Sequence, residues 1–151
     1  ELLPESGFAR RVTSFVSAPP EQVRAALADP ASLRFYAIDP SSEVSEDGLT
    51  TTTARRGKSM TIRAELTESN DDAVTWVMRL KDTPHAGEVS SYHRFQFTEA
   101  PGGTELTHDL GVRTFGTLGR LLRPMTTFFS GFAMTTQRYW VAAHIAEWQG
   151  R

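Results

Sequence analysis

The feature that most constrains the fold is a change of periodicity late in the chain. Up to about residue 112, apolar and polar residues alternate in short segments, the period of half-buried β-strands. From about Leu118 to Trp148, apolar and aromatic residues recur every three or four positions, the period of an amphipathic helix. Antiparallel strands followed by one long helix predict an α+β fold in which a curved sheet wraps around the helix. We expect function to sit in a cavity between the two.

Turn-forming residues separate the alternating segments. We predict six to seven strands, at residues 8–16, 42–45, 49–55, 58–66, 73–81, 89–98 and about 105–112. Two short helices follow the first strand, at 22–28 and 31–36, because Asp29-Pro30 interrupts helical geometry. In the last stretch Pro124 either starts the long helix or kinks it, and we favour a start. With no repeat and no linker, residues 1–151 are expected to form a single domain.

Composition removes several classes of function. The chain has 151 residues, a formal net charge of -2 and no long basic stripe, so we expect no nucleic-acid partner. It has no cysteine, which excludes disulfides and thiolate metal sites. No run reaches the ~20 apolar residues of a membrane span, so no stable membrane insertion is expected. Residues 1–5 lack the pattern of a signal peptide. We expect a cytoplasmic monomer or homodimer.

The segments around Pro101-Gly-Gly103 place two histidines beside each other. A hairpin closed there pairs residues whose numbers sum to about 203, so Phe95 faces His108 and His93 faces Leu110. The two histidines then become diagonal neighbours, with Cβ atoms roughly 7 Å apart. Both are in phase with the apolar residues of their strands, so both should project inward.

Histidines in an apolar cavity have two interpretations. They can act as general acid and base near neutral pH, or they can be hydrogen-bonded packing residues. A third metal ligand at a recognisable spacing is absent from the sequence, so we expect no metal and no cofactor. Tyr139 is the third catalytic candidate, because its phenol can steady a developing enolate.

Other residues are expected to line the cavity. Tyr36 offers a second phenol, Ser14 and Ser91 add small polar groups, and Thr136 either bonds back to its own helix or points at a ligand. The apolar lining is expected to consist of Trp76, Met78, Phe95, Leu110, Phe129 and Phe132. The aromatic residues of the last stretch fit either a membrane-contact face or packing against the sheet, and packing is the simpler account.

Four short motifs carry a specific resemblance to a known superfamily. They are Val16-Ser-Ala-Pro-Pro-Glu-Gln-Val23, Leu27-Ala-Asp-Pro30, Gly102-Gly-Thr-Glu-Leu-Thr107 and Leu118-Gly-Arg-Leu-Leu-Arg-Pro124. Together they resemble the START/SRPBCC superfamily, in particular its polyketide cyclase/dehydrase-like branch. The chain departs from that pattern at Arg24 and at Phe35-Tyr36, where members commonly carry tryptophan. The resemblance implies a helix-grip fold that encloses a pocket for a hydrophobic or aromatic small molecule.

Two functions follow as hypotheses. The first is a cofactor-independent cyclase, dehydratase or isomerase acting on a polyketide or similar natural-product intermediate, with His93 or His108 moving a proton. The second is a non-catalytic carrier or sensor of a hydrophobic, lipid-like metabolite. The pair of inward histidines favours the enzyme, and the lack of an inward carboxylate or arginine favours the carrier. A weaker third possibility is a partner in a larger lipid or quinone assembly.

Overall fold

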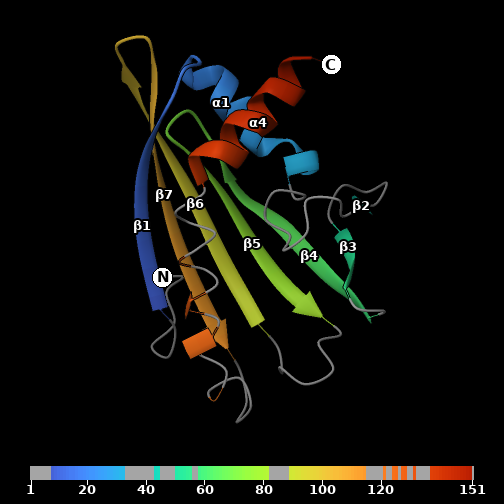
Figure 1. Ribbon diagram of the computed structural model, residues 1–151. Coiled ribbons are helices and arrows are strands. Elements are labelled where there is room, and N and C mark those ends of the chain that lie inside the picture. The colour runs from blue at the N-terminus through green and yellow to red at the C-terminus, as the bar shows by residue number, and fades with distance from the viewer. Residues whose placement is uncertain are drawn as a thin grey trace.

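Seven strands form one antiparallel sheet in a computed structural model that describes residues 8–32, 43–44, 50–55, 58–81, 89–114, 121, 124–125, 127–128, 131 and 137–150. The strands are β1 (Phe8–Val16), β2 (Glu43–Val44), β3 (Thr50–Arg55), β4 (Lys58–Ser69), β5 (Ala73–Lys81), β6 (Val89–Ala100) and β7 (Gly103–Thr114). Their order across the sheet is β1-β7-β6-β5-β4-β3-β2 (Figure 1). The first strand therefore pairs with the last, and the predicted strand number and antiparallel pairing are confirmed.

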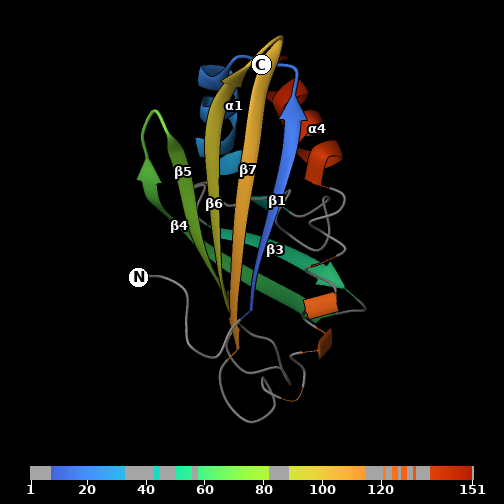
Figure 2. The same cartoon turned by 90° about the vertical axis from the view of Figure 1, so that its left-hand side faces the viewer.

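Two helices lie on one face of this curved sheet (Figures 1 and 2). They are α1 (Pro20–Ala28) and α4 (Gln137–Gln149), and a short 3-10 helix, η1 (Pro30–Ser32), follows α1. η1 covers the start of the second predicted helix, whose remaining residues lie outside the described part. Helix α1 carries Pro20 at its first position, two residues before the predicted start, and ends at Ala28 as predicted, with Asp29 and Pro30 following.

The main core lies between these helices and the sheet. Val23 and Leu27 of α1 are fully buried, and the indole Nε1 of Trp76 on β5 donates a hydrogen bond of 2.8 Å to the Leu27 carbonyl. His144 of α4 is also fully buried, and its Nε2 lies 2.5 Å from the carbonyl oxygen of Ala26. These two contacts fix the C-terminal end of α1 to both the sheet and α4.

The buried face of α4 differs from the one predicted. The expected stripe included Tyr139 and Ala143, yet Tyr139 is 63% exposed and Ala143 is exposed as well. Among the side chains of α4 that the structure describes, the buried ones are instead Val141, His144 and Ile145. The prediction assumed one uninterrupted helical periodicity from Leu118 onward, across Pro124 and Gly131. In α4 itself, the residues that face the core are set by the three- and four-residue spacing of Val141, His144 and Ile145.

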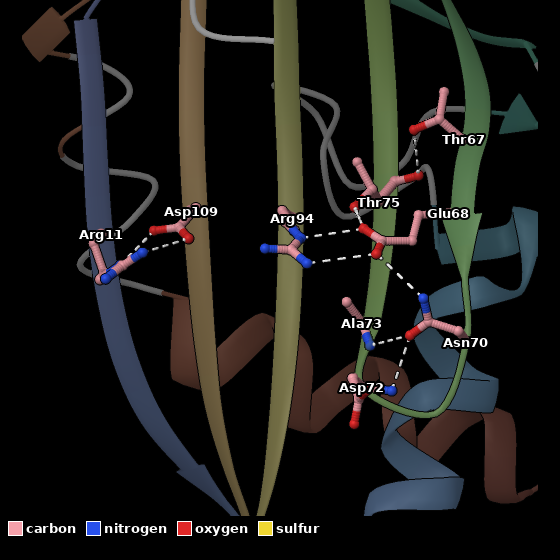
Figure 3. A network of polar contacts seen from close by, with 9 residues as sticks. All are labelled: Arg11, Thr67, Glu68, Asn70, Asp72, Ala73, Thr75, Arg94 and Asp109. Carbon is pink, nitrogen blue, oxygen red and sulfur yellow. Dashed lines mark hydrogen bonds and ion pairs between the residues drawn. The ribbon is translucent and has the colours of Figure 1, made fainter. Parts of the chain in front are cut away.

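A β-bulge in β4 redirects the side chains at its end. Leu66 pairs with Trp76, but the next pair is Glu68 with Thr75, so one extra residue lies on β4. Glu68 consequently faces the outer side of the sheet, where its carboxylate accepts hydrogen bonds from Thr75 (2.6 Å) and Arg94 (3.1 Å) (Figure 3). The Thr75 hydroxyl, and then the Arg94 guanidinium, lower the pKa of Glu68 below its ordinary value.

A second ion pair lies on the same outer face, on the neighbouring strands. Arg11 of β1 binds both carboxylate oxygens of Asp109 on β7, at 2.6 and 2.9 Å (Figure 3). Asp109 is the register partner of both Arg11 and Arg94. Charges of alternating sign therefore cross the outer face from β1 to β4.

Candidate functional site

The predicted hairpin register places the two candidate histidines on neighbouring strands. Phe95 pairs with His108 and His93 pairs with Leu110 across β6 and β7. Ala100 pairs with Gly103, so Pro101 and Gly102 form a two-residue turn. Gly102 has a φ of 82°, a conformation that suits glycine after proline. The turn therefore fixes the register, and the register fixes which residues meet on the inner face.

His93, His108 and Ser91 form a continuous polar chain. The Nδ1 of His93 lies 3.0 Å from the Nε2 of His108, and the Nε2 of His93 lies 3.1 Å from the Oγ of Ser91. The imidazole of His108 also stacks on the ring of Phe95, with centroids 4.2 Å apart. His108 is 1% exposed and His93 is partly buried. Both ring nitrogens of His93 are thus held in defined positions.

This environment favours the uncharged form of His93. Burial, and then the repulsion between the two imidazoles if both carried charge, hold the pKa of His93 well below its ordinary value of 6.5. In the contact between the rings, one nitrogen donates and the other accepts. When Nδ1 of His93 holds the proton, Nε2 presents a lone pair toward Ser91. The chain of three groups can therefore accept a proton at one end and pass charge to His108 at the other.

His93 and His108 lie between two separate apolar clusters of the molecule. Along β7, Leu106 belongs to the main core, His108 comes next, and Leu110 belongs to a smaller cluster with Val112 and the half-buried Val12. The histidines therefore stand between the packed core under α1 and α4 and a second apolar patch on the inner face. A polar group at such a boundary can face a bound molecule while its other side is buried.

The remaining predicted site residues fall into three groups. Trp76, Met78, Phe95 and Leu110 are buried on the inner face, and Ser14 is partly buried on β1 opposite Leu106. Tyr139 is 63% exposed, which contradicts the expectation that its phenol faces the interior. The other predicted site residues, which lie outside the described part, are Tyr36, Phe129, Phe132 and Thr136.

A hollow of about 620 Å³ lies elsewhere on the described part of the molecule. It is lined by the β1–α1 connection, the start of α1, the β4–β5 turn and the β6–β7 turn. Gly103, on its rim, is separated from His108 by five residues of β7, roughly 17 Å of strand. This hollow is open and contains none of the predicted site residues, so the cavity beside His93 and His108 stays a prediction.

Arg10 and His144 were not among the residues predicted from the sequence. Arg10 precedes Val12 by two positions on β1, and strand alternation alone would have placed it on the inner face. His144 lies three residues after Val141 on α4, and a helical phase drawn from the C-terminal residues alone would have found it. His144 joins α4 to α1 through Ala26 and is not part of the histidine pair.

Within the described ranges, no three histidine, aspartate or glutamate side chains gather as a metal-binding group would require. None of the described helices has the length and apolar character needed to cross a membrane.

Comparison with known protein families identifies the branch to which this fold belongs. Residues 9–137 match the model of the family described as polyketide cyclase / dehydrase and lipid transport. The chain belongs to this family. The resemblance drawn from the four sequence motifs is therefore confirmed. Among the curated proteins, none matches the chain.

Solved structures show the same fold at low sequence identity. A conserved protein from Geobacillus kaustophilus has a TM-score of 0.67 and 14% identity, and the match covers 93% of this chain and 96% of that one. The ZhuI aromatase/cyclase from Streptomyces sp. R1128 has a TM-score of 0.60 and 18% identity, with 93% and 94% covered. A START superfamily protein from Mycobacterium smegmatis has a TM-score of 0.60 and 16% identity, with 92% and 97% covered. The family and these likenesses establish an α+β helix-grip fold of the START type.

Proposed function

We propose that this family member is a cofactor-independent enzyme that moves a proton in an aldol cyclisation, dehydration or isomerisation of a hydrophobic carbonyl compound. The observation that carries the proposal is the hydrogen-bonded chain of Ser91, His93 and His108 at the boundary of the buried core. The family description, which includes polyketide cyclase and dehydrase activity, supports the same reaction class and a polyketide-like substrate.

In this proposal His93 is the group that meets the substrate. A carbon acid that displaces the Ser91 hydroxyl from Nε2 meets a neutral imidazole, and that nitrogen takes the proton next to the substrate carbonyl. The Nδ1 proton of His93 shifts toward Nε2 of His108, so the positive charge spreads over two rings. In a dehydration, the same proton returns to the departing hydroxyl, which leaves as water.

Deuterium exchange into a model ketone tests this chemistry without knowledge of the natural substrate. We use 2-tetralone, a bicyclic aromatic ketone with acidic C–H bonds beside its carbonyl, and follow loss of those proton signals in D₂O by NMR. The parent protein should accelerate the exchange, and His93→Gln and His108→Gln should each slow the catalysed rate ~10²–10⁴-fold. Because the pKa of His93 is depressed, the parent rate should stay constant down to below pH 6.5.

The matched control is His144→Gln, which also replaces a buried histidine but lies on α4 against Ala26. It should keep the parent exchange rate if it folds, as checked by circular dichroism. Parent-like exchange in both His93→Gln and His108→Gln would contradict the proposal, because the histidines would then be packing residues.

A second candidate function is that of a carrier or sensor of a hydrophobic, lipid-like metabolite. The lipid transport activity named in the family description favours it. If the parent protein binds 2-tetralone in saturable fashion but does not accelerate exchange, the carrier is the better account.

A further inference from the structure

Arg10 brings a positive charge to the inner face of the sheet. On β1 the buried Val16 and the partly buried Ser14 and Val12 face the interior, and Arg10, which is exposed, follows in the same alternation at the start of the strand. The neighbouring Arg11 points to the outer face, where it binds Asp109. The consecutive residues Arg10 and Arg11 therefore lie on opposite faces of the sheet.

Arg10 stands in the same transverse row as the candidate base. It pairs with Leu110 on β7, Leu110 pairs with His93 on β6, and His93 pairs with Trp76 on β5. Two steps between strands of about 4.8 Å each separate the backbones of Arg10 and His93 by roughly 10 Å. A cation, an apolar residue, a base and an aromatic residue thus follow one another across the inner face.

The guanidinium of Arg10 is positioned but has no anionic partner among the described residues. A Cβ atom added at Gly131 would lie 3.2–3.4 Å from three of its atoms, so the group rests against the backbone of that glycine. The described ion pairs, Arg11 with Asp109 and Arg94 with Glu68, both lie on the outer face. Within the part of the chain that the structure describes, no carboxylate binds Arg10.

We propose that Arg10 forms an anion-binding subsite that holds a carboxylate or phosphate group at one end of an apolar ligand. The body of the ligand lies against the half-buried Val12, which follows Arg10 on the same face of β1, and reaches the partly buried His93 with its reactive carbon. A guanidinium recognises either oxyanion through a pair of parallel hydrogen bonds. The inference rests on the proposed function only for the position of the reactive carbon, since anion binding needs no catalysis.

Calorimetric titration with three naphthalene probes tests the subsite. The probes are 2-naphthoate, its neutral methyl ester and 2-naphthyl phosphate, which share one apolar body. The parent should bind at least one anion about tenfold or more tightly than the ester. Tighter binding of the carboxylate indicates a free acid as the natural ligand, and tighter binding of the phosphate indicates a phosphorylated one; either order supports the proposal.

Arg10→Gln should remove the preference for the anions and leave the affinity for the ester unchanged. The matched control is Arg79→Gln, which removes the same charge from an exposed position on the outer face and should keep the preference. An Arg10→Gln protein that still prefers the anions overturns the proposal, and so does a parent that binds no anion more tightly than the ester. Neither result depends on the 2-tetralone exchange, so the subsite and the proton-transfer function can fail separately.

Discussion

At the scale of single residues, His93 shows how location determines charge. Its ring lies beside the buried imidazole of His108, where an ionised group loses hydration and meets a second ring that can also become charged. The unfolded chain imposes neither condition, so the same histidine there has an ordinary pKa near 6.5. The difference between the two states links protonation to the stability of the fold.

We expect the free energy of unfolding to fall as pH drops from 7.5 to 5.5. Below pH 6.5 the unfolded chain binds a proton at His93 that the folded chain does not, so stability rises with pH across this window. The slope contributed by this one group is at most about 1.4 kcal/mol per pH unit. Urea unfolding at three pH values measures it, and His93→Gln should have a smaller slope than the parent. Equal slopes in the two proteins would show that His93 has the same pKa in the folded and unfolded states, which would contradict the prediction.

At the scale of elements, the hairpin and the last helix differ in how far the sequence determines them. The β6–β7 register follows from Pro101-Gly102 and from strict alternation around it, so the meeting of His93 and His108 was predictable. The bulge after Leu66 was not, because the residues that follow are all polar and only the pairing with β5 reveals the extra residue. The phase of α4 depends on its contacts with α1 and β1, which a periodicity drawn from distant residues cannot supply.

The phase of α4 can be tested by comparing two large-to-small substitutions. Ile145→Ala removes a side chain that is 4% exposed in the main core and should lower the free energy of unfolding by about 2–5 kcal/mol. Tyr139→Ala removes a larger side chain that is 63% exposed and should change stability by less than about 1 kcal/mol. Chemical denaturation measures both. If Tyr139→Ala is the more damaging change, the helix faces the sheet in the phase first predicted from the sequence.

At the scale of the whole molecule, the sheet joins the beginning of the chain to its last strand. β1 pairs with β7 along its full length, from Phe8 opposite Val112 to Val16 opposite Thr104. Gly103 lies at the end of this seam, where a Cβ atom would come 2.2 Å from the carbonyl oxygen of Val16 and 2.8 Å from the ring of Phe15. The close approach of the two strands at this end therefore depends on a residue without a side chain.

Gly103→Ala should consequently destabilise the protein by about 1–3 kcal/mol, the usual cost of overpacking. The obstacle is a backbone oxygen, so a change of rotamer cannot relieve it. Gly150→Ala is the control, since the atoms nearest to an added Cβ there lie at an ordinary 3.6 Å. Thermal unfolding of both variants measures the difference, and equal stability would mean that β1 moves away from β7 at no cost.

The strand order also decides which strands lie at the edges of the sheet, where two copies of the protein could pair. A sheet with open ends can recruit a strand from a neighbouring molecule and begin to aggregate. In the described sheet one end is β2, which is only two residues long, and the other is β1, which carries Arg10 and Arg11 side by side. Arg11 is neutralised by Asp109, so two copies approaching through β1 would bring together the positive charges of their two Arg10 side chains. The charged edge strand therefore disfavours self-association through this edge, even in concentrated solution.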